Sequence, residues 1–224
     1  TYADAYMFDE AAKILSLAPN ENEPMVHYYM YRFTGEKAEL EKAEKADSLY
    51  CFPNRLEDIA VLENAIKDGG EYAKYYLGCL FYDKGRWQES QVLWESCADK
   101  ISLATVYRNL SLVYYNKLHD AAKAQTALER AFAMDKTDAR VFFELDQLYK
   151  TLNYSLEKRL DNMNSNAELL EKRDDLYTEY ITLLNLNGEY MNAYNRIMNH
   201  NFHPWEGGEG KIPAQFRSAL MGMA

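Results

Sequence analysis

Cysteine, proline, glycine and long apolar segments are all scarce in this chain of 224 residues. Cys51, Cys79 and Cys97 form no CxxC motif, and their odd number argues against a disulfide framework or a cysteine zinc site. We expect three buried small apolar residues, which weakly favours a reducing cytoplasm. A signal segment upstream of Thr1, which would direct the chain to another compartment, stays an open alternative. No apolar run approaches the roughly 20 residues that a membrane-spanning helix needs.

Basic charge and catalytic motifs are also missing. The chain has 25 Lys and Arg residues against 35 Asp and Glu residues, so its formal net charge is −10. Binding to a nucleic-acid duplex requires clustered Lys and Arg, and an anionic membrane surface also attracts basic segments. The acidity therefore argues against both partners. P-loop, GxGxxG, HExxH and GxSxG motifs do not occur. We predict neither catalysis nor a cofactor within this chain.

What the sequence does contain is a repeat. Segment 71–102 alternates small and large residues at the spacing of a two-helix hairpin, and similar units start at Ala104, Ala139 and Asp174. Successive starts lie 33, 35 and 35 residues apart. A period near 34 residues is typical of an open stack of antiparallel helix pairs, in which each pair buries its apolar face against the next.

The spacing of apolar residues predicts about twelve helices and no convincing strand. Ahead of the repeats, irregular helix pairs are expected within 1–70. Their helices are predicted over 3–17, from about Pro24 to about Phe33, over 36–50 and over 54–67. Four repeats are expected at 71–102, 104–136, 139–172 and 174–200. A tail rich in Gly and Pro, with a short terminal helix over 214–223, occupies 201–224.

Two local details are expected within these helices. Asn54 and Glu57 have the spacing of a capping box that opens helix 54–67. In the third repeat, the second helix is predicted to run unbroken from about 155 to 171 with one apolar stripe. The stripe consists of Leu156, Leu160, Met163, Ala167 and Leu170.

The first repeat resembles a tetratricopeptide repeat (TPR). That family packs a small residue at position 8 of the first helix against a small residue at position 20, here Gly78 and Ser90. The later units keep the pattern less regularly, and the third departs most, with Asn162 near a position that takes a large residue. The resemblance implies a right-handed superhelical solenoid. The residues at positions 11, 17, 24 and 27 are Phe81, Trp87, Trp94 and Cys97.

Other stretches are similar to the repeat region of one group of large bacterial proteins. The matching stretches are CFPNRLEDIAVLENAI, VYRNLSLVYYNK, FELDQLYK, EKRDDL and FHPWEGGEGK. In that group the front half is an uncharacterised β-rich domain that resembles carbohydrate-active folds. The resemblance implies that this chain is a fragment of a larger bacterial protein, and it implies no catalysis within the chain.

The first helix of each pair is expected to line the inner surface of the stack. Tyr and Arg are enriched in binding hot spots, and an extended peptide is able to lie across several pairs. In the other interpretation, the tyrosines pack between helices with their hydroxyls at the surface. The Lys and Asn set of carboxylate-clamp repeats is absent, so a free C-terminal carboxylate is not the expected ligand. The candidate groove residues are Tyr72, Tyr75, Tyr82, Arg108, Tyr115, Asn116, Arg140, Phe143 and Gln147.

Two further motifs lie near the C-terminus. His200 and His203 have a spacing that metal ligands use, but a helix end between them and the lack of a third ligand argue against a metal site. The second motif is the tail, whose candidate residues are Phe202, Trp205, Glu206 and Glu209. One interpretation is a sugar site, in which Trp205 stacks on the sugar and the two carboxylates act as acid and base. The alternatives for the tail are docking against the parent's front domain and capping of the last apolar helix face.

These observations predict a non-catalytic scaffold for protein–protein or interdomain interactions. Its partner is expected to be a protein or peptide segment, or the front domain of its own parent. The alternative is an accessory half of a carbohydrate-active enzyme whose catalytic part lies outside this chain.

Overall fold

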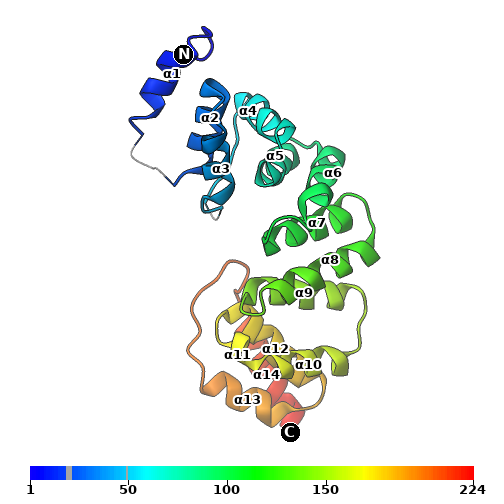
Figure 1. Ribbon diagram of the computed structural model, residues 1–224. Helices are drawn as coiled ribbons and strands as arrows, with labels where there is room; N and C mark the ends of the chain where they lie inside the picture. Colours follow the sequence, from blue (N-terminus) through cyan, green and yellow to red (C-terminus); the bar gives the residue numbers. More distant parts are fainter. Residues whose placement is uncertain (19–21, 49) are drawn as a thin grey trace. The chain divides into compact units, whose positions relative to one another are not determined.

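The computed structural model describes residues 1–18, 22–48 and 50–224. Within these ranges the chain forms fourteen helices and no strand, where the sequence predicts about twelve helices (Figure 1). The predicted all-α architecture of helix pairs is therefore confirmed. None of the described helices is long and apolar enough to cross a bilayer. The chain divides into two compact units, Thr1–Leu118 and His119–Ala224; the division at residues 70 and 200 stays a prediction.

Most helices that follow one another in the first unit pack against each other, most extensively α5 against α6, whereas α4 packs chiefly against α2 and α5 rather than against α3. Its core contains large aromatic side chains that are almost completely buried, among them Tyr28, Tyr76 and Trp94. The helices are α1 (Phe8–Leu15), α2 (Pro24–Thr34), α3 (Lys37–Lys45), α4 (Leu56–Lys67), α5 (Glu71–Asp83), α6 (Trp87–Cys97) and α7 (Ala104–Asn116).

The second unit is organised around α12, which packs against α9, α10, α11, α13 and α14. Its core is formed by aliphatic and aromatic residues such as Phe142, Leu176 and Ile181, all with no measurable exposure. The helices are α8 (Ala121–Met134), α9 (Ala139–Thr151), α10 (Leu156–Ser165), α11 (Ala167–Leu170), α12 (Asp174–Leu186), α13 (Tyr190–Met198) and α14 (Lys211–Met223).

The first predicted helix, over 3–17, is wrong at its N-terminal end, because α1 begins only at Phe8. Tyr6 has a φ of 59°, a left-handed conformation that a helix of L-residues does not propagate. The amide of Met7 donates to the carbonyl of Tyr2 at 2.9 Å, which closes a turn ahead of α1. The helix predicted over 36–50 is also shorter, because Ala46 (ψ 158°) is extended.

The predicted capping box of helix 54–67 is wrong by one residue. Oδ2 of Asp58 accepts hydrogen bonds from the backbone N–H groups of Asn54 (3.1 Å) and Arg55 (3.0 Å), whereas Glu57 is exposed. The helix accordingly begins at Leu56. A carboxylate in the first turn satisfies N–H groups there and also interacts favourably with the helix dipole.

Helix α5 is capped by a side chain from a different helix. The carboxylate of Glu44, on α3, accepts hydrogen bonds from the backbone N–H groups of Glu71 (2.8 Å), Tyr72 (2.9 Å) and Ala73 (3.2 Å). It also accepts one from the hydroxyl of Tyr28 at 2.6 Å. The first-turn N–H groups of α5 are therefore satisfied by a tertiary contact, which fixes α5 relative to α2 and α3.

The turns between paired helices have two lengths. The three-residue turns before α6 and α13 place Gly85 (φ 77°) and Gly188 (φ 81°) in the left-handed region. The four-residue turns before α8 and α10 place His119 (φ 55°) and Asn153 (φ 59°) there instead. Glycine adopts this conformation without steric cost, and Asn and His tolerate it better than most residues.

The extra residue in each longer turn serves as a side-chain N-cap. Asp120 accepts a hydrogen bond from the backbone N–H of Lys123 at 3.0 Å, and Ser155 accepts one from that of Lys158 at 3.2 Å. The shorter turns before α6 and α13 end in residues whose side chains form no such cap. The insertion moves the second helix of these repeats one position along the sequence.

This insertion accounts for the irregular third repeat. Met163, and not Asn162, takes the position of the large residue and is completely buried. The unbroken helix predicted to 171 is wrong, because it stops at Ser165 and α11 begins after Asn166. Nδ2 of Asn166 donates to the carbonyl of Asn162 at 2.8 Å, and its backbone N–H donates to that of Met163 at 3.1 Å. These bonds close a tighter turn in place of the helical pattern.

At the crossing of α5 and α6, the backbone of one helix lies against side chains of the other. Oγ of Ser90 donates to the carbonyl of Gly78 at 2.8 Å, and both residues are buried. Nε1 of Trp94 donates to the carbonyl of Tyr75 at 3.1 Å. A Cβ on Gly78 would come within 2.6 Å of Cδ1 of Trp94, so only glycine allows this approach.

The third repeat places a buried ion pair at the corresponding crossing of α9 and α10. Asp146 takes the position of Gly78, and Arg159, after the one-residue shift, takes that of Ser90. Arg159 forms two hydrogen bonds with Asp146, at 3.0 and 2.6 Å, and a third with Glu179 of α12 at 2.8 Å. The side chains of Arg159 and Asp146 are 3% and 0% exposed.

The pKa values of the two carboxylates in this cluster shift in opposite directions. Burial raises the pKa of Asp146 against the influence of Arg159. Burial also acts to raise the pKa of Glu179, but hydrogen bonds from Lys150 and Arg159 outweigh it and lower that pKa. Arg159 therefore offsets part of the cost of burying Asp146, and together with Lys150 it more than offsets the cost at Glu179.

We expect Gly78→Ala to destabilise the first unit by about 1–3 kcal/mol through overpacking against Trp94. Ala is the better helix former by about 1 kcal/mol, so an exposed glycine would show the opposite sign. Urea unfolding measures the change. In a Trp94→Leu background the cost should shrink. An equal cost in both backgrounds would show that the ring does not select the glycine.

We expect Arg159→Met to cost about 3–5 kcal/mol of unfolding free energy, because Asp146 would stay buried without its partner. The double variant Asp146→Leu with Arg159→Met should recover most of this loss. Both are measured by chemical denaturation with circular dichroism. If Arg159→Met alone unfolds at the denaturant concentration of the unmodified chain, the pair does not hold α9 and α10 together.

Candidate functional site

Within the first unit, side chains of α5, α6 and α7 enclose a small pocket. Its volume is about 110 Å³, and it is lined by Cys79, Tyr82, Trp94, Asn109 and Leu112. Nδ2 of Asn109 lies 3.8 Å from Sγ of Cys79, which links α7 to α5 at this point. The rings of Tyr82 and Trp94 are tilted against each other with centroids 5.8 Å apart. The pocket is therefore mostly apolar with one amide in its lining.

The thiol in this pocket is not set up for chemistry. Burial raises the pKa of Cys79 to about 12, so the thiol is protonated at neutral pH. A reactive cysteine needs the opposite shift, which comes from nearby positive charge or a helix N-terminus. Cys51 and Cys97 are buried, with their pKa values also raised to about 12 by burial. Cys79 accordingly serves as apolar lining.

Six of the nine predicted groove residues lie on α5 and α7, and their exposure differs. Tyr75 is only 8% exposed, and burial raises its pKa, so it belongs to the packing between helices. Tyr72, Tyr82, Arg108 and Tyr115 are half-buried. Asn116 is exposed. Five of the six are therefore accessible to solvent, and they lie on two of the helices that line the small pocket.

The remaining three predicted groove residues lie on α9 of the second unit. Nε of the exposed Arg140 pairs with Glu144 at 3.2 Å. Phe143 is half-buried. Nε2 of Gln147 lies 3.4 Å from Oδ2 of Asp146, next to the buried ion pair. These residues therefore border the structural cluster of the second unit.

Of the five residues that line the small pocket, only Tyr82 was predicted as a site residue. The sequence pattern placed Trp94 in the helix packing of the repeat, and it missed Cys79, Asn109 and Leu112 altogether. The helical spacing contains them, since Cys79 follows Tyr75 by four residues and Leu112 precedes Tyr115 by three. Their side chains are neither charged nor aromatic, so a search for hot-spot residue types passes over them.

Near the C-terminus, both histidines contact one carboxylate. Nε2 of His200 lies 2.7 Å from Oδ1 of Asp174, while Oδ2 accepts from the backbone N–H of His203 at 2.6 Å and faces its Nδ1 at 3.3 Å. The ring of His200 stacks on Tyr177 with centroids 4.0 Å apart, and Phe202 packs edge-on against both rings. This cluster fastens the chain after α13 to the start of α12.

The described residues contain no group of three or more His, Cys, Asp and Glu side chains placed to hold a metal ion. Burial acts to raise the pKa of Asp174, but hydrogen bonds from His200 and His203 outweigh it and lower that pKa. Asp174 is therefore an anion that the His200-x-x-His203 motif surrounds.

The remaining tail residues form a tight turn ahead of α14. The six-membered ring of Trp205 lies against Gly208, where an added Cβ would come within 2.6 Å of Cε2. Glu206 and Glu209 are both exposed. The predicted terminal helix, over 214–223, begins earlier, at Lys211.

Comparison with solved structures identifies the class of fold. The chain is similar to YrrB, described as a TPR protein with an unusual peptide-binding site, at 15% identity and a TM-score of 0.52, over 96% of this chain and 97% of that one. It is also similar to the C-terminal part of a TPR repeat-containing protein from Cytophaga hutchinsonii. That match has 16% identity and a TM-score of 0.50 and covers 99% and 76% of the two chains.

No protein-family model matches the sequence. The similarity to solved structures concerns the fold, and the fold is that of TPR proteins.

We expect Asp174→Asn to destabilise the second unit by about 1–3 kcal/mol at pH 7, because hydrogen bonds to a charged acceptor are lost. The pKa of Asp174 is lowered on folding from its ordinary value of 3.8. Its stabilising effect is therefore present above that value and disappears as the pH falls through the folded-state pKa. Urea unfolding of both proteins at several pH values should show the difference shrinking in acid. A difference that does not depend on pH would contradict this role.

Proposed function

We propose that this chain is a non-catalytic scaffold that binds a protein segment. The binding surface would be the face of α5 and α7 in the unit Thr1–Leu118. The observation that carries the proposal is the 110 Å³ pocket, with Tyr72, Tyr82, Arg108, Tyr115 and Asn116 accessible on the same two helices. Pockets bordered by Tyr and Arg are typical of interaction hot spots.

The size of the pocket indicates what it accepts. A volume of 110 Å³ equals about four liquid-water volumes, which is the size of one branched aliphatic side chain. Asn109, in the lining, has an amide group with both donors and an acceptor, which is what a peptide backbone requires. The favoured ligand is therefore an extended segment that inserts one Val, Leu or Ile side chain between α5 and α7.

The fold supports this function. YrrB, which has the same fold, is described as carrying a peptide-binding site. Two observations support the non-catalytic part of the proposal. The thiol in the pocket is protonated, and Glu206 and Glu209 are solvent-exposed. The native partner of this surface would be another protein or a front domain of a larger bacterial parent.

The test uses a random 12-residue peptide library displayed on phage and selected against the full chain. Peptides that insert an aliphatic side chain should bind the Leu112→Glu variant at least tenfold more weakly than the unmodified chain, because the change places a charge in the pocket. Fluorescence polarisation with labelled peptides measures the affinity.

Val92→Glu on α6 is the matched control, since Val92 is 62% exposed and lies outside the pocket. Circular dichroism establishes that both variants fold. If no peptide is enriched, or if Val92→Glu weakens the selected peptides as much as Leu112→Glu does, the proposed surface is wrong.

A further inference from the structure

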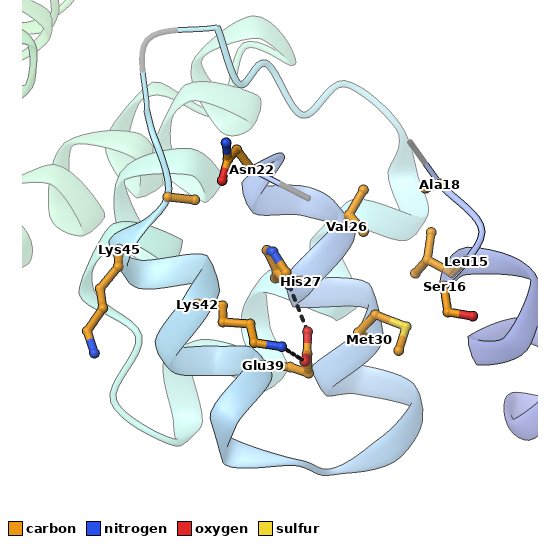
Figure 2. A pocket seen from close by; sticks show the side chains of 11 residues that line it. Leu15, Ser16, Ala18, Asn22, Val26, His27, Met30, Glu39, Lys42 and Lys45 are labelled. Atoms are coloured by element: carbon orange, nitrogen blue, oxygen red, sulfur yellow. Dashed lines mark hydrogen bonds and ion pairs between the residues drawn. The ribbon is translucent and has the colours of Figure 1, made fainter. Parts of the chain in front are cut away.

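A much larger cavity lies in the first unit, away from the proposed peptide surface. It has a volume of about 590 Å³ and is formed by residues of α1, α2 and α3 together with Ser16, Ala18, Asn22 and Ala46 (Figure 2). This volume is within the range of sites that hold small organic molecules. Leu15, Val26 and Met30 contribute apolar surface, and His27, Glu39 and Lys42 contribute charged and polar groups.

The polar groups of the cavity are linked to one another. Oε2 of Glu39 lies 2.7 Å from Nδ1 of His27, and Oε1 accepts from Nζ of Lys42 at 2.5 Å. Figure 2 shows the side chains of His27 and Lys42 reaching Glu39. Val26, Met30 and Leu15 lie on the side of the cavity nearer to α1. The cavity therefore has an apolar side and a charged side, as a site for an amphipathic molecule requires.

The carboxylate holds the lysine ammonium at the cavity wall. Burial acts to raise the pKa of Glu39, but hydrogen bonds from Lys42 and His27 outweigh it and lower that pKa. The side chain of Glu39 is 11% exposed, whereas that of Lys42 is 57% exposed. The negative charge is thus buried beneath the ammonium, which presents its positive charge to the cavity and to solvent.

The charge of the lining differs in sign from that of the whole chain. The lining residues include one acidic residue, Glu39, and two lysines, Lys42 and Lys45. Nζ of Lys45 lies 3.8 Å from Oε2 of Glu41, which is not part of the lining. In Figure 2 this ammonium points away from Glu39, so Lys42 is the lysine that the cavity presents. The chain as a whole carries a net charge of −10. An apolar cavity with an exposed ammonium on its wall favours a ligand that is apolar at one end and anionic at the other.

We propose that this cavity binds a small amphipathic carboxylate, with its apolar part against Leu15, Val26 and Met30 and its carboxylate near Lys42. This site is separate from the proposed peptide surface and does not depend on it. The binding is non-covalent, and Glu39 serves to position the ammonium.

The test uses octanoate as the probe, with octanol and octylamine as matched neutral and cationic probes of the same chain length. Binding to the full chain is measured by isothermal titration calorimetry and by NMR of ¹³C-methyl methionine. Octanoate should bind at least tenfold more tightly than octylamine and should shift the Met30 methyl signal, identified by its loss in Met30→Leu. The signals of Met191 and Met221, in the second unit, should not move.

Lys42→Gln should weaken octanoate about tenfold and leave octanol unchanged, because only the charged contact is lost. Val26→Trp should abolish binding of octanoate and of octanol, because the larger side chain fills the cavity. Val92→Trp on α6 serves as the control and should leave the binding of both probes unchanged. Lys42 is largely exposed, so its variant keeps the test informative if Val26→Trp fails to fold. Equal binding of octanoate and octylamine, an unmoved Met30 signal, or no effect of Lys42→Gln would overturn the proposal.

Discussion

The close crossing of the two helices within a repeat is the constraint on which the rest of the structure depends. In the first repeat, Gly78 brings the α5 backbone against the ring of Trp94, and the hydroxyl of Ser90 donates to the carbonyl of Gly78. In the third repeat, Asp146 and Arg159 occupy the same positions as a buried ion pair. Small residues and a fully paired charge are two different solutions to burying the same point of contact, because each avoids an unsatisfied polar group.

The crossing also shapes the surface that the first unit presents. Trp94 covers Gly78 and lines the 110 Å³ pocket, so the residue that fixes α6 on α5 also forms part of the proposed peptide site. Glu44 fixes the start of α5 on α3, and Glu39, on the same helix, organises the larger cavity. The polar side chains of α3 therefore support two different surfaces of the unit Thr1–Leu118.

Much of the fold was predictable from the sequence, because apolar spacing and turn residues are local signals. The 34-residue period and the Gly78/Ser90 pair predict the helix pairs, and Gly85 and Gly188 mark two turns. The break at Asn166 was not predictable, since the apolar stripe from Leu160 to Leu170 continues through it. The cap from Glu44 and the Asp146–Arg159 pair join residues on different helices, so spacing along one helix does not show them. Likewise Tyr75 has the side chain of a binding residue, and only its 8% exposure identifies it as part of the packing.

Backbone hydrogen exchange measures the central constraint most directly. Amides next to the crossing, at Cys79 and Glu95, should exchange only when the whole unit opens, with a free energy equal to that of unfolding in denaturant. Amides of α1, whose only buried residue is Ala12, should exchange at much lower cost. If the amides at the crossing exchange as readily as those of α1, the contact between Gly78 and Trp94 does not hold the repeat together.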